Sequence, residues 1–398
     1  MADRQKRIAA IITSFWRMSH AEVIVGRLLA GYYYEGERQT PRVQIVSLYV
    51  DQFPENDMSR DLARKYDIPI YGTIAQALQM DGDELAVDGV VIVGEHGVYP
   101  YNIRGQEIYP RFHFFRQVVE VFKESGRCVP VFCDKHFSHD WEEAKWMYDM
   151  SVSMGFPLMA GSSLPLAWRN PELELDLETP VERAVAINYG PKERYGIHTL
   201  EALQCMVERR RGGETGVATA RCLEGDHVWE WTKQNSWADN LLSQAAACCP
   251  DTEGTPQEKA EAPILFVLEY RSGLQAACYL LNGYIKSAAF AADVEDVEAP
   301  VANHFRTQAR PHAHFSGLVY HIEEMMRTGR PSYPVERALL TTGALAAAFD
   351  SSYRQGNTIE LGRAVDTPHL QIAYRAPEES LFQRGTMPDA DPDFGIGP

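Results

Sequence analysis

Three polar stretches of the chain carry side chains that transfer protons in enzymes. Two of them directly follow apolar runs that have the look of buried strands, and the third lies near the start of an expected helix; they are Gly94-Glu95-His96, Cys133-Asp134-Lys135-His136, and His198 with Glu201. The carboxyl ends of parallel strands open onto one crevice in an α/β sheet. Histidine, lysine and carboxylates serve there as general acids and bases. The sequence therefore predicts catalytic roles for Lys135, His198, Glu95 and His96.

The same stretches permit other interpretations. Imidazole nitrogens and carboxylates bind divalent metals, so a metal site made by His96, His136 and His198 is one alternative, although the chain has no short-spaced ligand motif. A buried ion pair with Asp134 or Glu95 is the alternative for Lys135. For His198 the alternative is a core histidine at the start of a helix.

The first strand and the turn after it resemble the beginning of a dinucleotide-binding unit. The apolar run Ile8–Ile12 passes through a turn into an expected helix, Ala21–Ala30. A pyrophosphate binds at such a turn, at the positive end of the helix. The pattern predicts NAD or NADP contacts from Thr13, Ser14, Phe15, Trp16 and Arg17. Asp51, at the end of the second strand, would hold the adenosine ribose, or it is an ordinary residue of a strand end.

The elements that must position these residues alternate between strand and helix. Nearly continuous apolar runs predict strands at Val43–Val50, Ile68–Tyr71, Val87–Gly94, Cys128–Cys133 and Pro157–Ala160. Helical spacing between them predicts helices at Ser59–Tyr66, Thr73–Met80, Pro110–Glu124 and Trp141–Met154. Such alternation predicts an α/β domain with a Rossmann-type parallel sheet that is covered on both faces.

The pattern changes after Gly161, where strands follow one another with few helices between them. Longer alternating strands are expected at Val181–Tyr189, Gly216–Leu223, Ala262–Tyr270 and Leu274–Leu281, and helices at Gly196–Arg211, His314–Thr328 and Val335–Tyr353. We expect an α+β domain with a mainly antiparallel or mixed open sheet. The predicted units are residues 1–161, residues 162–375, and an irregular C-terminal tail at 376–398.

Composition and charge indicate which classes of partner and which cellular compartment to expect. The formal net charge of −17 argues against a general nucleic-acid binder, which needs a basic face. No apolar run approaches the length of a membrane span. The seven cysteines are odd in number and form no Cys-x-x-Cys pair, as is typical of reduced thiols. The sequence predicts a cytoplasmic protein with no membrane or nucleic-acid partner.

Several separate segments resemble the glucose–fructose oxidoreductase / inositol dehydrogenase (Gfo/Idh/MocA) family. The first turn keeps Phe15-Trp16 and His20-Ala21, and Tyr66–Thr73 resembles the family's "Tyr-Gly-Ile-Pro-x-Tyr-x-Thr" segment. Asp134-Lys135-His136 stands where the family has Glu-Lys-Pro. Gly196–Glu201 resembles Gly-x-His-x-x-Asp. The resemblance covers nearly the whole chain.

The resemblance implies an oxidoreductase that uses NAD or NADP and acts on a sugar, a polyol or a related carbohydrate. Lys135 and His198 stand at the positions of the family's catalytic lysine and its general acid or base. Tyr101, in a polar-aromatic segment, Arg169, Arg194 and Glu201 are the expected substrate-binding residues. Family members often form homodimers or homotetramers through the open face of the second sheet.

The departures from the family fall at the active positions. Arg194 stands where the family has an Asp, and His136 replaces the Pro of Glu-Lys-Pro. The first turn differs as well. Ile12, Ser14 and Arg17 replace all three glycines, and a side chain at the first two positions blocks close approach of a phosphate to the backbone. A second hypothesis is therefore a non-redox enzyme of the same fold, such as a metal- or Lys/His-assisted sugar lyase, hydratase or isomerase. A third is a non-catalytic member that senses or scaffolds.

Overall fold

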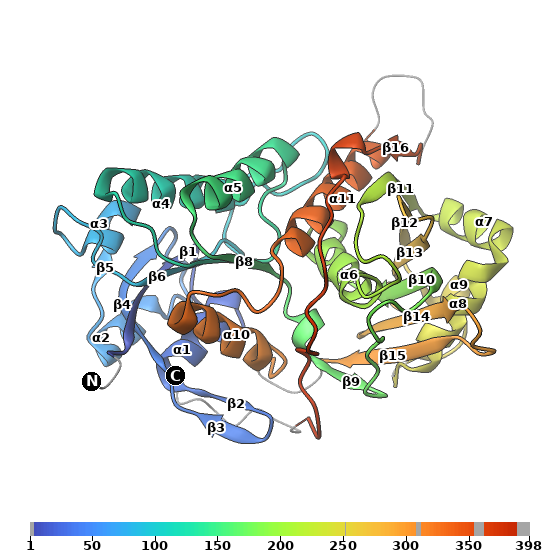
Figure 1. The fold of residues 1–398 in the computed structure, drawn as a ribbon, viewed down its shortest axis with the longest axis horizontal. Coiled ribbons are helices and arrows are strands. Elements are labelled where there is room, and N and C mark those ends of the chain that lie inside the picture. The colour runs from blue at the N-terminus through green and yellow to red at the C-terminus, as the bar shows by residue number, and fades with distance from the viewer. Residues whose placement is uncertain (1–3, 251, 308–311, 354–361, 388–398) are drawn as a thin grey trace.

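The computed structural model describes residues 4–250, 252–307, 312–353 and 362–387. Two large sheets lie side by side along the long axis of the molecule (Figure 1). The first has six strands in the order β5-β4-β1-β6-β7-β8, and all its pairings are parallel. The second has eight strands in the order β16-β11-β12-β13-β10-β14-β15-β9 and is mixed. The predicted fold class is confirmed.

The first sheet consists of buried apolar strands. Its members are β1 (Lys6–Ile12), β4 (Val43–Val50), β5 (Ile70–Tyr71), β6 (Gly89–Val93), β7 (Val131–Asp134) and β8 (Leu158–Gly161). The strand order reverses between β1 and β6, and ligands bind at such a switch point, beyond the carboxyl ends of the strands. The chain leaves β6 at Gly94 and β7 at Lys135, so the expected catalytic residues stand at this edge.

Helices cover both faces of the first sheet, as predicted. Figure 1 shows α4 (Arg111–Ser125) and α5 (Trp141–Met154) on one face, and α1 (Arg27–Ala30) with α10 (Phe315–Thr328) on the other. The shorter helices α2 (Ser59–Tyr66) and α3 (Ile74–Gln79) join neighbouring strands. Helix α10 comes from the later part of the chain but packs into the core beneath β1 and β4. The division at residue 161 remains a prediction.

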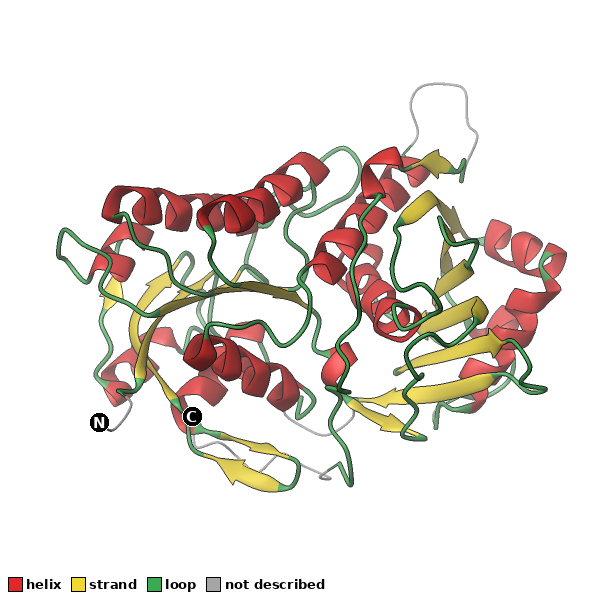
Figure 2. Ribbon diagram, in the orientation of Figure 1, coloured by secondary structure: helices red, strands yellow, loops and turns green. Residues whose placement is uncertain are grey.

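Helices also lie on both sides of the second sheet (Figure 2). Its strands are β9 (Trp168–Asn170), β10 (Val181–Asn188), β11 (Val217–Glu224), β12 (Ile264–Tyr270), β13 (Gln275–Leu280), β14 (Ala288–Val294), β15 (Val301–Arg306) and β16 (Val365–Asp366). Helices α6 (Lys192–Val207) and α11 (Glu336–Ser352) pack on one face. Helices α7 (Asp226–Gln234) and α8 (Ser236–Ala247) pack on the other. The face that was expected to be open therefore carries helices over β10 and β14.

The remaining elements are short. The first helix differs from prediction, because it opens as a π-helical turn at Glu22–Gly26 before α1 begins. A hairpin of β2 (Tyr32–Tyr34) and β3 (Glu37–Gln39) follows it, and α9 (Pro256–Lys259) precedes β12. Residues 376–387 of the predicted tail contain no helix or strand. None of the described helices is both long and apolar enough to pass through a bilayer.

Candidate active site

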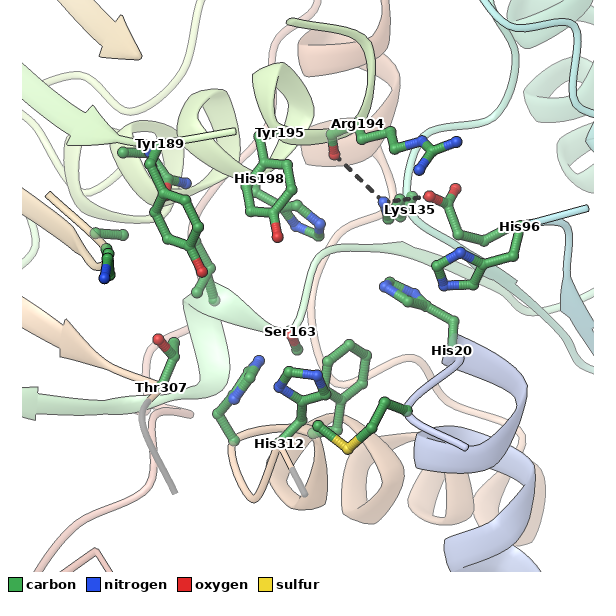
Figure 3. A pocket seen from close by; sticks show the side chains of 18 residues that line it. His20, His96, Lys135, Ser163, Tyr189, Arg194, Tyr195, His198, Thr307 and His312 are labelled. Carbon is green, nitrogen blue, oxygen red and sulfur yellow. Dashed lines mark hydrogen bonds and ion pairs between the residues drawn. The ribbon is translucent and has the colours of Figure 1, made fainter. Parts of the chain in front are cut away.

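A cavity of about 350 Å³ lies where the carboxyl ends of β1, β6 and β7 face the first turns of α6 and α10. Figure 3 shows side chains from both halves of the chain pointing into it. Five of the predicted site residues line this cavity, namely Glu95, His96, Lys135, Arg194 and His198. Segments more than a hundred residues apart in sequence thus meet at one site.

Lys135 is held at the cavity wall by a charged network. Its Nζ lies 2.7 Å from Oε1 of Glu95 and donates to the backbone oxygen of Arg194 at 3.3 Å, as the dashed lines of Figure 3 mark. Glu95 also accepts from Nη2 of Arg111 at 2.7 Å. Burial would raise the pKa of Glu95, but Lys135 and Arg111 outweigh burial and hold that pKa well below its usual value. One buried carboxylate is therefore shared by two cations, of which Lys135 faces the cavity.

The backbone at Lys135 is unusual. Its φ is +62°, a left-handed conformation that lysine rarely adopts. The backbone N–H of Lys135 donates to the carbonyl of Gly161 at 3.1 Å, so the end of β8 fixes this turn. Such conformations gather at functional sites, where the surrounding structure enforces them.

His20 and Asp134 form a dyad that the sequence analysis did not foresee. Nδ1 of His20 lies 2.6 Å from Oδ2 of Asp134, which is buried at the end of β7. A carboxylate only accepts hydrogen bonds, so Nδ1 carries the hydrogen and Nε2 is left as the basic nitrogen. His20 lines the cavity, and its ring contacts that of His96 with centroids 5.4 Å apart. This arrangement orients a general base.

Two further histidines in the wall are neutral. Burial, followed by repulsion from Lys135, lowers the pKa of His198 well below its usual value, and its Nδ1 shares a 2.6 Å hydrogen bond with Oγ of Ser162. Burial lowers the pKa of His96 to about 3. Nε2 of His96 has no hydrogen-bond partner among the described residues. Both rings can exchange hydrogen bonds with a ligand without carrying charge.

The predicted metal set is not brought together. His136 does not line the cavity; its Nε2 faces Nη1 of Arg111 at 3.1 Å, and its pKa is lowered by burial and by that guanidinium. Among the described residues, no group of three or more His, Cys, Asp and Glu side chains is arranged to hold a metal ion. His96, which follows β6, and His198, on α6, both reach the cavity. His136 points toward Arg111 instead.

Of the predicted substrate-binding residues, only Arg194 lines the cavity. Tyr101 is 61% exposed, and its hydroxyl donates to Glu107, which also accepts from Arg194. Arg169 is buried against Glu174 at 3.0 Å, and Glu201 accepts from the backbone N–H of Ser162. Sequence analysis missed other lining residues that belong to later segments; they are Asn188, Tyr189, Tyr195, Lys286, Thr307, His312 and His314.

In the turn predicted to bind a dinucleotide, several backbone N–H groups donate hydrogen bonds to side chains of the turn itself. Oγ of Ser19 accepts from the backbone N–H groups of Trp16 and Glu22, each at 3.2 Å. The carboxylate of Glu22, which is buried, accepts from the N–H of Met18. The buried carboxylate of Glu22 thus lies at the helix start, where a pyrophosphate binds in a dinucleotide-binding turn.

Among the other predicted cofactor residues, Thr13 and Asp51 have hydrogen-bond partners within the protein, and Arg17 points to solvent. Thr13 is buried and donates to backbone oxygens of Val93 and Glu95, and Arg17 is exposed. Asp51 accepts from the hydroxyls of Tyr49 and Tyr99 at 2.9 and 2.7 Å.

A separate cavity of about 220 Å³ adjoins the turn and is lined by Ser14, Trp16, Gln52, Pro54, Asn56, Gly97 and Val98. Trp16 borders this cavity and His96 borders the larger one, and the two rings meet with centroids 5.0 Å apart. A dinucleotide needs one continuous groove from adenosine to nicotinamide. The described turn thus offers a pyrophosphate few free amides, and the rings of Trp16 and His96 lie between the two cavities.

Solved structures with the same architecture identify the fold. GenD2 from gentamicin A biosynthesis, in complex with NAD, superposes with a TM-score of 0.56 at 15% identity, over 91% of this chain and 96% of that one. An oxidoreductase from Agrobacterium radiobacter, in complex with NAD+, L-tartaric acid and magnesium, gives 0.54 at 16% identity, over 90% and 98%. A myo-inositol dehydrogenase from Corynebacterium glutamicum gives 0.52 at 13% identity, over 91% and 98%.

The chain has the fold of the Gfo/Idh/MocA-type oxidoreductases. The resemblance inferred from sequence segments is thereby confirmed at the level of the fold. No family model matches the sequence, and no curated protein matches it either. The Gfo/Idh/MocA-type fold accounts for the placement of Lys135 and His198 at one crevice, while function depends on the site itself.

Proposed function

We propose that this protein is a proton-transfer enzyme of the isomerase or lyase type, which acts on a small hydroxylated substrate without a bound dinucleotide. The observation that carries the proposal is the contrast within one crevice. The cavity at Lys135 and His20 holds acid, base and oxyanion-stabilising groups, whereas the amides of Trp16, Met18 and Glu22 are already hydrogen-bonded within the turn.

Each group in the cavity has a role in such a reaction. Nε2 of His20, with Asp134 behind the ring, removes a proton from a carbon next to a substrate carbonyl. The Lys135 ammonium lies at the wall to stabilise the negative charge that develops on the carbonyl oxygen. His198, which is neutral, exchanges hydrogen bonds with a substrate hydroxyl, and the protonated His20 returns its proton to the substrate carbon or to a leaving hydroxyl, which departs as water. The electron pair of the C–H bond thus passes into the enolate and then to a new C–H or C=C bond.

Tyrosine and amide side chains supply the surroundings for hydroxyl groups. Tyr189 and Tyr195 line the cavity with ring centroids 5.0 Å apart, and Asn188 lies beside them at the end of β10. Aromatic faces with adjacent hydrogen-bonding groups suit the alternating apolar and hydroxyl surfaces of a sugar. The cavity volume is near the lower end for small-molecule sites, which matches a monosaccharide-sized substrate.

Proton exchange with solvent tests this proposal directly. The purified protein is incubated in D2O with a panel of aldoses, ketoses and keto-acids, and deuterium incorporation is followed by NMR and mass spectrometry. We expect exchange at a carbon next to a carbonyl, without added nucleotide and in the presence of EDTA. An exchange that appears only after NAD(H) or NADP(H) is added contradicts the proposal.

An NAD(P)-linked oxidoreductase on a sugar or polyol is the second candidate. It is favoured by the position of Lys135 and His198 in a fold whose solved examples include complexes with NAD. Isothermal titration with NAD(H) and NADP(H) separates the candidates, because only the oxidoreductase requires a bound nicotinamide. Micromolar binding would replace the first proposal with this one.

A further inference from the structure

The charges around the cavity have one dominant sign. Three cationic residues line it, namely Lys135, Arg194 and Lys286. Glu95 is the single acidic residue among the described residues that line it. This balance is the reverse of the whole chain, whose formal net charge is −17. A local excess of positive charge in an acidic protein marks the place where a negative ligand is favoured.

The carboxylates near the cavity are buried and paired with cationic groups or with His20. Glu95 is 1% exposed and contacts Lys135 and Arg111, so that two cations share it. Glu107 is 3% exposed and contacts Arg194, whose side chain is 40% exposed. Asp134 likewise contacts His20. The buried carboxylates thus position Lys135, Arg194 and His20 at the cavity.

Two imidazole nitrogens in the wall also await a partner. His314 is 7% exposed and lines the cavity, and its Nδ1 has no hydrogen-bond partner among the described residues. The same is true of Nε2 of His96. Unpartnered buried nitrogens are costly unless a ligand completes them. Burial lowers the pKa of both rings, so that each is neutral.

We propose that the substrate is a polyhydroxylated anion of monosaccharide size, with its carboxylate or phosphate group bound by the side chains of Arg194 and Lys286 and its carbonyl oxygen at Lys135. This inference rests on the proposed function, because it concerns the substrate of the same cavity. The hydroxyl groups face Tyr189, Tyr195 and Asn188. A neutral sugar or polyol would form no ion pair with these cations.

Matched ligands test the charge requirement. Isothermal titration and thermal shift are carried out with D-gluconate, D-glucose 6-phosphate, neutral D-glucitol and inorganic sulfate. We expect one or both sugar anions to bind and D-glucitol to give no shift; the better anion tells carboxylate from phosphate. Raising NaCl from about 50 mM to about 500 mM should weaken the binding about tenfold or more, because added salt screens the attraction.

Variants locate the binding in this cavity. Lys286→Met should weaken anion binding about tenfold, the effect of losing one charge contact. Lys233→Met, which removes an exposed lysine from α7 outside the cavity, should change nothing. Circular dichroism confirms that both variants fold.

Several results overturn the inference. They are equal binding of D-glucitol, a sulfate shift as large as that of the sugar anions, indifference to Lys286→Met, or no binding by either anion. Failure of the proposed function is recognised separately, since a requirement for NAD(H) or NADP(H) in the exchange assay removes it without altering the binding of D-gluconate by the protein alone.

Discussion

The two ends of the crevice use similar residues to opposite effect. At the ends of β6 and β7, Lys135 and His20 are held by buried carboxylates and face a cavity. At the turn after β1, Ser19 and Glu22 accept hydrogen bonds from the backbone amides beside them. At the first end, the carboxylates orient Lys135 and His20 toward a ligand. At the second end, the carboxylate of Glu22 accepts the hydrogen bond of a backbone amide, which is then not available to a ligand. A fold-level comparison alone does not reveal this difference.

The largest effect is expected at Lys135. Lys135→Met removes the charge that stabilises a developing oxyanion, so the exchange rate should fall about 10²- to 10⁴-fold. Lys145→Met is the matched control, since Lys145 lies on the exposed side of α5 in a pair with Asp149. Deuterium incorporation measures the rate, and circular dichroism checks the fold. Unchanged exchange in a folded Lys135→Met protein contradicts the assignment.

A second prediction concerns stability behind the cavity wall. Burial raises the pKa of Glu193 from 4.5 to about 7, and neither carboxylate oxygen has a hydrogen-bond partner among the described residues. The folded state therefore keeps a proton that the unfolded chain loses above 4.5, and stability falls as the pH rises toward 7. Glu193→Gln removes the ionisation and should gain up to about 3 kcal/mol at about pH 8 and little near pH 4.5.

Urea unfolding at several pH values measures the gain. The exposed Glu182→Gln on β10 is the control and should give a difference between the two pH values of less than about 0.5 kcal/mol. If the stability gained by Glu193→Gln does not depend on pH, the pKa of Glu193 is the same in the folded and the unfolded protein, which contradicts the prediction.

The dyad of His20 and Asp134 gives the third prediction. Asp134→Asn cannot accept the Nδ1 hydrogen in the same way and frees the other tautomer, so exchange should fall about tenfold to a hundredfold. His20→Gln should fall at least as far, while His113→Gln, an exposed histidine on α4, should keep full activity. Equal rates for wild type and His20→Gln would assign the base to another residue.

The sequence predicted the scaffold of this comparison well. Parallel strands buried on both faces are nearly continuous in apolar residues, so all six strands of the first sheet were recognisable. The rule for strand ends then brought Glu95, His96 and Lys135 together. Helices α7 and α8 were not predicted, because each is short and depends on packing against β10, β14 and the neighbouring strands.

The finer features of the site depend on side-chain directions that spacing does not encode. His20 and Asp134 are 114 residues apart and meet only because one imidazole turns toward β7. Residue spacing likewise did not indicate that the ring of His136 points toward Arg111 and not toward the other histidines of the predicted metal site. The sequence showed that the turn lacks the family's glycines. It did not show that the backbone amides of the turn are hydrogen-bonded to Ser19 and Glu22.

The smallest effect is expected at the turn, and it separates the two ends of the crevice. Ser19→Ala removes the acceptor for the N–H groups of Trp16 and Glu22, which should lower stability by about 1 kcal/mol, as for the loss of a helix cap. Exchange in the cavity should remain within about twofold of wild type, because the turn binds no ligand in the proposed reaction. Urea unfolding and the deuterium assay give both values. A large loss of exchange without a loss of stability would show that Ser19 or its amides contact the substrate, and the turn would then belong to the active site.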